Sequence, residues 1–152
     1  MIIFGKKEAD ISYKWRPGVY GLIFNEKNQI ALIRTDEGKY FLPGGGMEDY
    51  ETHQECLVRE GIEETALILT VGEWIGKAKQ YFYSENDQQH YLSEGDFYLA
   101  HIAGKADGPA ELDHHLEWIE LDAAIEKLFH EHQRWAVRKV LKLAKNHHLH
   151  SI

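Results

Sequence analysis

The sequence predicts an α/β sandwich with a mixed central sheet, and three observations lead to this fold class. Segments rich in β-branched and aromatic residues make up most of the first hundred positions, one helical segment interrupts them, and two helical segments close the chain. Such a series buries its apolar faces by packing helices on a sheet. A length of 152 residues fits one core, so we expect a single domain over residues 1–152.

The first predicted strands are residues 18–24 and 29–34, which flank the polar turn "NEKN" and are expected to form a hairpin. A short strand within "YFLPGGG" then ends in a glycine loop. Two longer strand segments follow, over residues 68–83 and 89–103. Three glycines are expected to interrupt them, namely Gly72, Gly76 and Gly95.

The helical segments are marked by their start signals and their periodicity. Thr52, followed three positions later by Glu55, matches a capping box, so a helix is expected to begin near Thr52 and to end near Thr65. A last short strand, "LEWIEL", precedes the segments "DAAIEKLFH" and "QRWAVRKVLKLAKN". We expect these two segments to form the closing helices.

Acidic residues are concentrated in residues 42–67. This segment holds seven carboxylates and one arginine, and so carries most of the chain's net charge of −8. Its acids are Glu48, Asp49, Glu51, Glu55, Glu60, Glu63 and Glu64. Because carboxylates at this density repel one another, the segment indicates a cation site. A chain with this acidic balance is not expected to bind nucleic acid through backbone charge.

Cysteine usage and the N-terminus indicate the compartment. Cys56 is the one cysteine, which excludes an internal disulfide and favours a reducing environment. The start "MIIFGKKEAD" lacks the apolar core of a signal peptide, and the longest apolar run is too short to span a bilayer. We therefore expect a cytoplasmic protein that does not bind membranes.

The helix predicted over residues 53–65 places three carboxylates on one face. Glu60 is four residues before Glu64 and three before Glu63, and like charges at these spacings oppose helix formation by about 0.2–0.5 kcal/mol per pair. The opposite face is apolar and is expected to pack on the sheet. A solvated acidic face is one interpretation. The preceding "PGGG" loop, which lets backbone approach a ligand, favours an oxygen-ligated Mg²⁺ site instead.

The spacing within residues 45–67 resembles the Nudix box, G-x5-E-x7-R-E-U-x-E-E-x-G-U, where U is a bulky aliphatic residue. The matching residues are Gly45, Glu51, Arg59, Glu60, Glu63 and Glu64. On this basis the chain is identified as a member of the Nudix hydrolase family of MutT-like proteins. The resemblance implies an α/β/α sandwich with a mixed central sheet.

Two positions depart from the family pattern. Gly61 stands where the family has an aliphatic residue, and Ala66 stands where it has glycine. Gly61 lowers helix propensity by about 1 kcal/mol relative to alanine, and Ala66 replaces the glycine that favours a left-handed helix end. Neither change removes a ligand, so we expect lower stability and retained activity.

The resemblance also implies a role for each residue of the box. The implied ligands of Mg²⁺ or Mn²⁺ are Gly45, through its carbonyl, Glu60, Glu63 and Glu64. Arg59 is implied to orient the carboxylates, and Glu51 to close the loop onto the helix. Cys56 is expected to pack and not to act as a nucleophile.

The implied reaction is hydrolysis of a nucleoside diphosphate linked to another moiety, with attack of water on phosphorus. A carboxylate must accept the proton of the water, and several are candidates. These are Glu60, Glu63 and, in the later loop, Glu111, Asp113 and Glu117. His114 and His115 of this loop are expected to be exposed.

Recognition of the nucleobase is expected to use aromatic side chains. The aromatic candidates are Tyr81, Phe82, Tyr83, Phe97, Tyr98 and Trp118. Tyr81, Tyr83 and Phe97 are predicted to bind the substrate, together with Glu111 and Glu117. The position of Tyr83 after the box also resembles a marker of diadenosine polyphosphate hydrolases.

The substrate class therefore stays open between a small number of nucleotides. We expect a nucleoside triphosphate with a normal or oxidised base, and a dinucleoside polyphosphate is the alternative. A nucleotide-sensing module without turnover is the alternative from another class, although such modules usually lose glutamates of the box. Membership of the family is also compatible with a homodimer.

Overall fold

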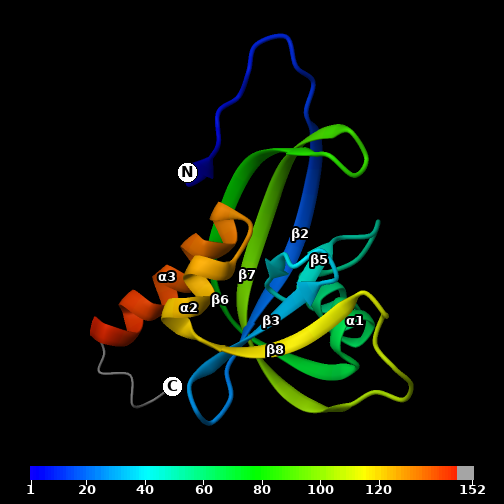
Figure 1. The fold of residues 1–152 in the computed structure, drawn as a ribbon, viewed down its shortest axis with the longest axis vertical. Coiled ribbons are helices and arrows are strands. Elements are labelled where there is room, and N and C mark those ends of the chain that lie inside the picture. Colours follow the sequence, from blue (N-terminus) through cyan, green and yellow to red (C-terminus); the bar gives the residue numbers. More distant parts are fainter. Residues whose placement is uncertain (147–152) are drawn as a thin grey trace.

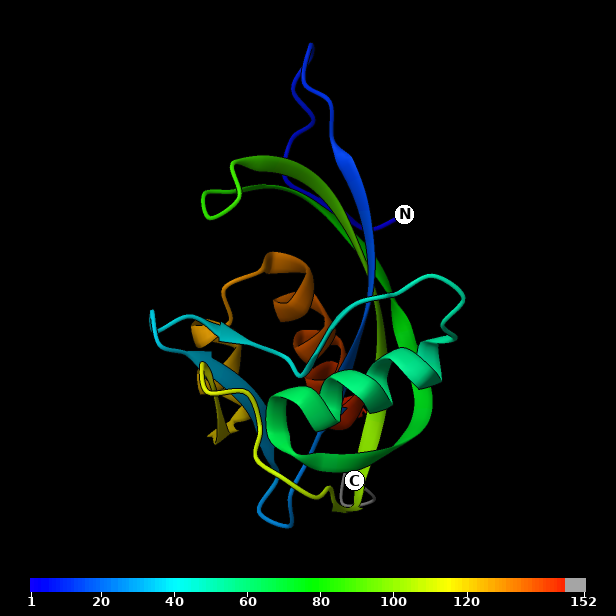
Figure 2. The same cartoon turned by 90° about the vertical axis from the view of Figure 1, so that its right-hand side faces the viewer.

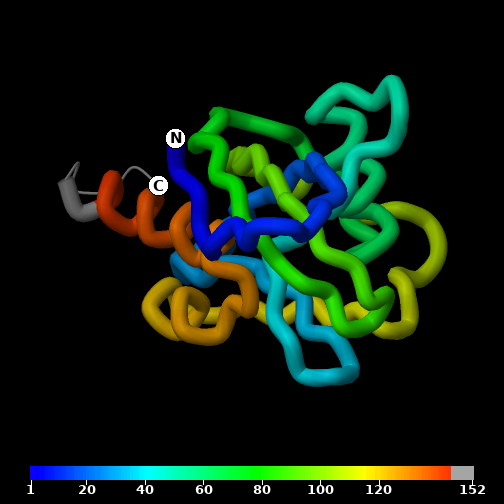
Figure 3. The backbone as a smooth tube through the Cα atoms, turned by 90° about the horizontal axis from the view of Figure 1, so that it is seen from above, coloured from blue at the N-terminus to red at the C-terminus, as the bar shows by residue number. Residues whose placement is uncertain are grey.

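The computed structural model describes residues 1–146, and its central feature is a five-stranded sheet in the order β1-β6-β7-β2-β5 (Figure 1). The strands are β1 (Ile3–Phe4), β2 (Lys14–Ile23), β5 (Gly44–Gly46), β6 (Leu67–Ser84) and β7 (Gln89–Lys105). β2 is parallel to β7 and β1 to β6, whereas β6–β7 and β2–β5 are antiparallel. The predicted mixed central sheet is thus confirmed. Figure 3 shows the N-terminal segment beside β6, where β1 pairs.

Three further strands form a smaller antiparallel sheet. They are β4 (Tyr40–Phe41), β3 (Gln29–Thr35) and β8 (His114–Glu120), in the order β4-β3-β8. The prediction that β2 and β3 form a hairpin is wrong, although the turn between them is present. The turn forms, because Asn25 N–H donates to the Gln29 carbonyl at 3.0 Å, but the two strands then enter different sheets.

Helices cover both sides of the central sheet (Figure 2). They are α1 (His53–Thr65), α2 (Leu121–Lys127) and α3 (Glu131–Asn146). The two faces of β2 pack against different helices. Val19 and Ile23 on one face pack in the α1 layer, whereas Leu22 on the other face packs with Val137 of α3. The architecture is the predicted α/β/α sandwich. No helix within residues 1–146 is long and apolar enough to cross a membrane.

Both ends of α1 follow from local chemistry. The capping box is present, since Thr52 Oγ1 accepts from Glu55 N and Glu55 Oε1 accepts from Thr52 N. At the other end Ala66 adopts the left-handed conformation (φ 59°) that favours glycine, and its N–H bonds the Ile62 carbonyl at 3.0 Å. A β-carbon at Gly61 would press on the Leu69 side chain, so β6 fills the space left by the missing side chain.

The long strands β6 and β7 are more continuous than expected. The pairing shifts register between Val71 and Trp74 and again before Gly76, so this stretch bends by bulges and the strand does not end there. Gly95 does not interrupt β7, because it pairs with Gly18 and Ala78. Its lack of a side chain makes room for the Phe97 ring instead.

Candidate functional site

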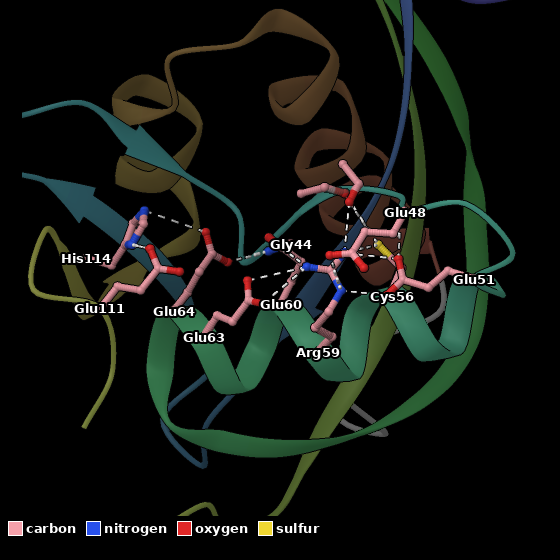
Figure 4. A network of polar contacts seen from close by, with 12 residues as sticks. Gly44, Glu48, Glu51, Cys56, Arg59, Glu60, Glu63, Glu64, Glu111 and His114 are labelled. Carbon is pink, nitrogen blue, oxygen red and sulfur yellow. Dashed lines mark hydrogen bonds and ion pairs between the residues drawn. The ribbon is translucent and has the colours of Figure 1, made fainter. Parts of the chain in front are cut away.

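The acidic face of α1 lies against the glycine strand β5 (Figure 4). Gly44 N–H donates to Glu64 Oε1 at 2.8 Å. A β-carbon at Gly45 would overlap the carboxylate of Glu60, so a side chain at this position would displace that carboxylate. The glycines therefore place backbone directly beside two carboxylates.

Arg59 connects most of the acidic residues of the box (Figure 4). Its Nε and Nη2 donate to the two carboxylate oxygens of Glu51 at 2.5 and 3.0 Å. Its Nη1 donates to Glu60 Oε1 at 3.0 Å and to Glu63 at 3.4 Å, and Nη2 also bonds the Gly46 carbonyl at 3.0 Å. One guanidinium thus ties the glycine loop to the helix and orients three carboxylates.

Burial and charge perturb these acids in opposite directions. The hydrogen bond from Arg59 lowers the pKa of Glu51 to about 2. Burial, followed by repulsion from Glu63, raises the pKa of Glu60 to about 7. Burial also raises the pKa of Glu64 well above its usual value. Burial thus disfavours the ionised forms of Glu60 and Glu64, and a bound cation would compensate the negative charge of these forms.

The donor set fits a hard divalent cation, because it consists of carboxylate oxygens next to backbone carbonyls. Within residues 1–146, no three Asp, Glu, His or Cys side chains already converge closely enough to hold an ion. Arg59 Nη1 instead binds Glu60 and Glu63 together. A cation held by this face would therefore require the two carboxylates to turn away from Arg59.

The loop before β8 joins the same cluster (Figure 4). Glu111 N–H donates to the Glu63 carbonyl at 2.9 Å, which docks the loop on the end of α1. The Glu111 carboxylate lies 2.9 Å from His114 Nδ1, and His114 Nε2 lies 4.0 Å from Glu64. His114 is consequently half-buried and not exposed as expected, because a loop acid and a helix acid flank its ring.

The other two loop acids lie elsewhere. Asp113 Oδ1 accepts from Asp36 N–H at 3.0 Å. Glu117 on β8 accepts from Arg34 Nε at 2.5 Å and from the Tyr40 hydroxyl at 3.1 Å, and the Arg34 bond lowers its pKa. These contacts belong to the smaller sheet, so the structure does not bring Asp113 and Glu117 into the cluster on α1.

A cleft of two adjoining cavities extends from the cluster. The inner cavity has a volume of about 240 Å³ and reaches Gly45 and Glu64, and the outer cavity has a volume of about 380 Å³. The residues that line both are Phe41, Phe82, Ser84 and His130. Together the cavities fall in the size range of small-molecule sites. We call them the aromatic cleft.

The predicted substrate residues divide between this cleft and the core. Tyr83 lines the outer cavity and is 45% exposed. Tyr81 packs edge-on against Tyr13 and lines neither cavity, and Phe97 is completely buried. Phe82 follows Tyr81 and lines both cavities, because successive residues of a strand face opposite sides.

Three cleft residues were not expected from the sequence. His130, His132 and Gln133 lie at the start of α3 and line the inner cavity. His132 and Gln133 are each only 1% exposed. In the sequence they look like ordinary polar residues at a helix start, and the only available signal was the cluster "HEHQ" itself.

Cys56 is buried on α1, and its Sγ lies 3.5 Å from the Gly45 carbonyl oxygen. Burial raises the pKa of the thiol to about 12, so it stays protonated at neutral pH. These contacts agree with the expected packing role.

Known proteins place this architecture in a family. The NUDIX domain model matches residues 14–140. Similar solved structures include a NUDIX hydrolase from Nitrosomonas europaea, with a TM-score of 0.69 and 15% identity over 85% of this chain and 90% of that chain. The MutT protein from Methanosarcina mazei Go1 has a TM-score of 0.66 and 23% identity over 88% and 98% of the two chains.

An Ap4A hydrolase from C. elegans has a TM-score of 0.66 and 16% identity over 86% of this chain and 98% of that chain. No curated protein matches the sequence. Since the domain match covers most of the chain and the solved structures share the fold over 85% and 88% of its length, the protein belongs to the Nudix hydrolase family of enzymes that act on phosphoanhydride bonds.

Proposed function

We propose that this enzyme is a pyrophosphohydrolase dependent on Mg²⁺ or Mn²⁺, and that its substrate is a nucleoside triphosphate with a normal or oxidised base. One observation carries the proposal: the cluster on α1 opens directly into the aromatic cleft through Gly45 and Glu64. Phosphates beside the carboxylates would leave the nucleoside in the cleft.

In this proposal Glu60, Glu63 and Glu64 hold the cation with the Gly45 carbonyl. The bound cation neutralises charge that develops on phosphate oxygens during hydrolysis. When Glu60 and Glu63 turn to the cation, Arg59 stays bonded to Glu51 and to the Gly46 carbonyl, and so holds the glycine loop against the helix. Because Glu51 is the tightest partner of Arg59, it supports the site and does not touch the substrate.

A carboxylate that water can reach must accept the proton of the attacking water. Glu63 and Glu111 have side chains that are 40% and 51% exposed, whereas Glu64 is almost fully buried. We assign the proton acceptor to this exposed pair. Glu111→Gln distinguishes them, because Glu111 is not a ligand of the cation: a lower kcat with little change in KM assigns the proton acceptor to Glu111, and an unchanged kcat assigns it to Glu63.

A nucleotide panel tests the proposed function. Release of phosphate and pyrophosphate is measured with Mg²⁺ for normal and oxidised nucleoside triphosphates and for dinucleoside polyphosphates, in the wild type and in Glu64→Gln. Turnover that needs the cation and is lost in the variant supports the proposal. Binding of a nucleotide without any product would instead indicate a sensing module.

The outer cavity favours dinucleoside polyphosphates as the second candidate. Tyr83 and Phe129 line it beyond the shared residues, so a second nucleoside has a surface to occupy. If this candidate is correct, the panel shows higher kcat/KM for dinucleoside polyphosphates than for every nucleoside triphosphate, and Tyr83→Ala lowers only the former.

A further inference from the structure

Two glutamine side chains beside the aromatic cleft have fixed orientations. Gln80 Oε1 accepts from the backbone N–H of His132 at 3.0 Å. Gln133 Oε1 accepts from the backbone N–H of Leu42 at 2.7 Å. A backbone N–H can only donate, so the oxygen and the nitrogen of each amide are unambiguous. Each glutamine therefore has its amide nitrogen free to donate elsewhere.

The orientation of Gln80 determines the tautomer of His130. Gln80 Nε2 lies 3.1 Å from His130 Nδ1, and because the amide nitrogen donates, Nδ1 must accept. The proton of the neutral ring is then on Nε2. Burial lowers the pKa of His130 to about 4, so the ring is neutral at pH 7. Within residues 1–146, Nε2 has no hydrogen-bond partner in the protein.

Aromatic packing holds the His130 ring where the two cavities meet. Its centroid lies 4.8 Å from that of Phe82, 5.0 Å from Phe129 and 5.4 Å from Phe41. Gln133 lines the inner cavity next to it, and its amide nitrogen has no partner among the described residues either. The middle of the cleft thus combines flat aromatic walls with two groups that only donate, beside the Ser84 hydroxyl, which can donate or accept.

Acidic groups lie only at the two ends of the cleft. Glu64 is at the inner end, where Gly44 already occupies one of its oxygens. The outer cavity is lined by Glu37, Glu85 and Asp113, and none of these acids lines the inner cavity. A flat ring between Phe41 and Phe82 would therefore meet donors on its edge.

We infer that the aromatic cleft binds the nucleobase, and that His130 and Gln133 are specificity-determining donors that select bases with a carbonyl group over bases with an exocyclic amine. A carbonyl oxygen accepts from these donors. An exocyclic amine in the same place would leave donors facing each other without partners, a mismatch that hydrogen-bonding sites discriminate against. The inference builds on the proposed function and specifies its substrate class.

Two matched substrate pairs test the inference. ITP and ATP differ at position 6 of a purine, and UTP and CTP differ at position 4 of a pyrimidine. We expect the wild type to prefer the carbonyl member of each pair by about tenfold or more in kcat/KM. In His130→Phe the ring remains but the donor is lost, so the preference should fall to within about threefold, through KM and not kcat.

Two further variants complete the design. His130→Gln restores a donor close to the position of Nε2 and should recover most of the preference. His101→Phe makes the same change at an exposed histidine of β7, outside the aromatic cleft, and should leave the preference intact. Thermal unfolding of each variant confirms that it is folded.

The inference is overturned if the wild type hydrolyses both members of each pair equally well, or if His130→Phe keeps the full preference. Failure of the proposed function is a separate result, namely no hydrolysis of any nucleotide with Mg²⁺. In that case calorimetric titration with the same four nucleotides tests the base preference directly. Equal affinities for ITP and ATP would then refute it.

Discussion

The acidic cluster on α1 and the aromatic cleft beside it are built in different ways. The cluster comes from one continuous segment, since Glu51, Arg59, Glu60, Glu63 and Glu64 lie within fourteen positions. The cleft collects its lining from β4, β6 and the start of α3. The cluster is acidic, whereas the middle of the cleft, where its two cavities meet, is mainly aromatic. The proposed chemistry thus depends on helical spacing, and the proposed recognition depends on how distant segments pack.

The largest expected effect separates the chemistry of the cluster from its stability. Glu60→Gln should lower Mg²⁺-dependent hydrolysis at least about 100-fold. Without the cation, however, the variant should be more stable at pH 8. The raised pKa of Glu60 (about 7) means that its ionised form opposes folding above that pH. Activity assays and thermal unfolding in EDTA measure the two effects.

Glu55→Gln is the matched control on the same helix. Its side-chain oxygen still accepts from Thr52 N–H, so both activity and stability should stay near those of the wild type. A Glu60→Gln enzyme with wild-type turnover would show that this carboxylate does not serve the reaction.

Arg59→Met tests whether one guanidinium organises the cluster. It removes the bonds to Glu51, Glu60 and Glu63, so the free energy of unfolding should fall by about 2 kcal/mol and kcat/KM by about tenfold or more. Arg34→Met breaks the comparable pair with Glu117 outside the cluster. Urea unfolding should show a smaller loss there, and activity should be unchanged. Equal losses of activity in both variants would contradict a local role for Arg59.

Acid titration tests whether the buried ring of His132 stays neutral in the native protein. Burial lowers the pKa of His132 to about 3, so the unfolded chain takes up a proton between pH 6.5 and 3 that the native protein does not. This difference lowers stability as the pH falls. The ring nitrogens of His132 have no partner among the described residues, so His132→Asn loses no hydrogen bond of the ring.

The loss of stability between pH 6.5 and 4 should therefore be less steep in His132→Asn than in the wild type. Glu60 and Glu64 act with the opposite sign, since their raised pKa values favour the native state as the pH falls through this window. Both glutamates are present in the wild type and in the variant, so their contributions cancel when the two stability curves are compared. Parallel curves from urea unfolding at each pH would contradict the prediction.

The smallest expected effect concerns the end of α1. Ala66→Gly should stabilise the protein by about 1 kcal/mol, because glycine adopts the left-handed conformation without the cost that a β-carbon imposes. Ala103→Gly, at an exposed position of β7, should instead destabilise slightly. Thermal unfolding compares the two, and the reverse order would exclude strain at Ala66.

Local signals predicted the parts of the fold that depend on neighbouring residues. The capping box located the start of α1, and like-charge spacing located its acidic face. The hairpin of β2 and β3 was predicted wrongly because a turn and two apolar runs do not specify the partner of each strand. Val19 and Leu22 of β2 are fully buried on opposite faces, so the strand pairs within the central sheet and not with β3.

By itself the sequence determined the helix that carries the carboxylates, the glycines that approach them and the family to which the chain belongs. These features depend on spacings of a few residues, which backbone geometry converts directly into position. Tertiary structure alone decided that Phe82 faces the cleft while Phe97 is buried, and that His130 lies beside Phe82. The orientation of a strand's faces and the docking of a distant helix arise from the packing of the whole core, which no local pattern contains.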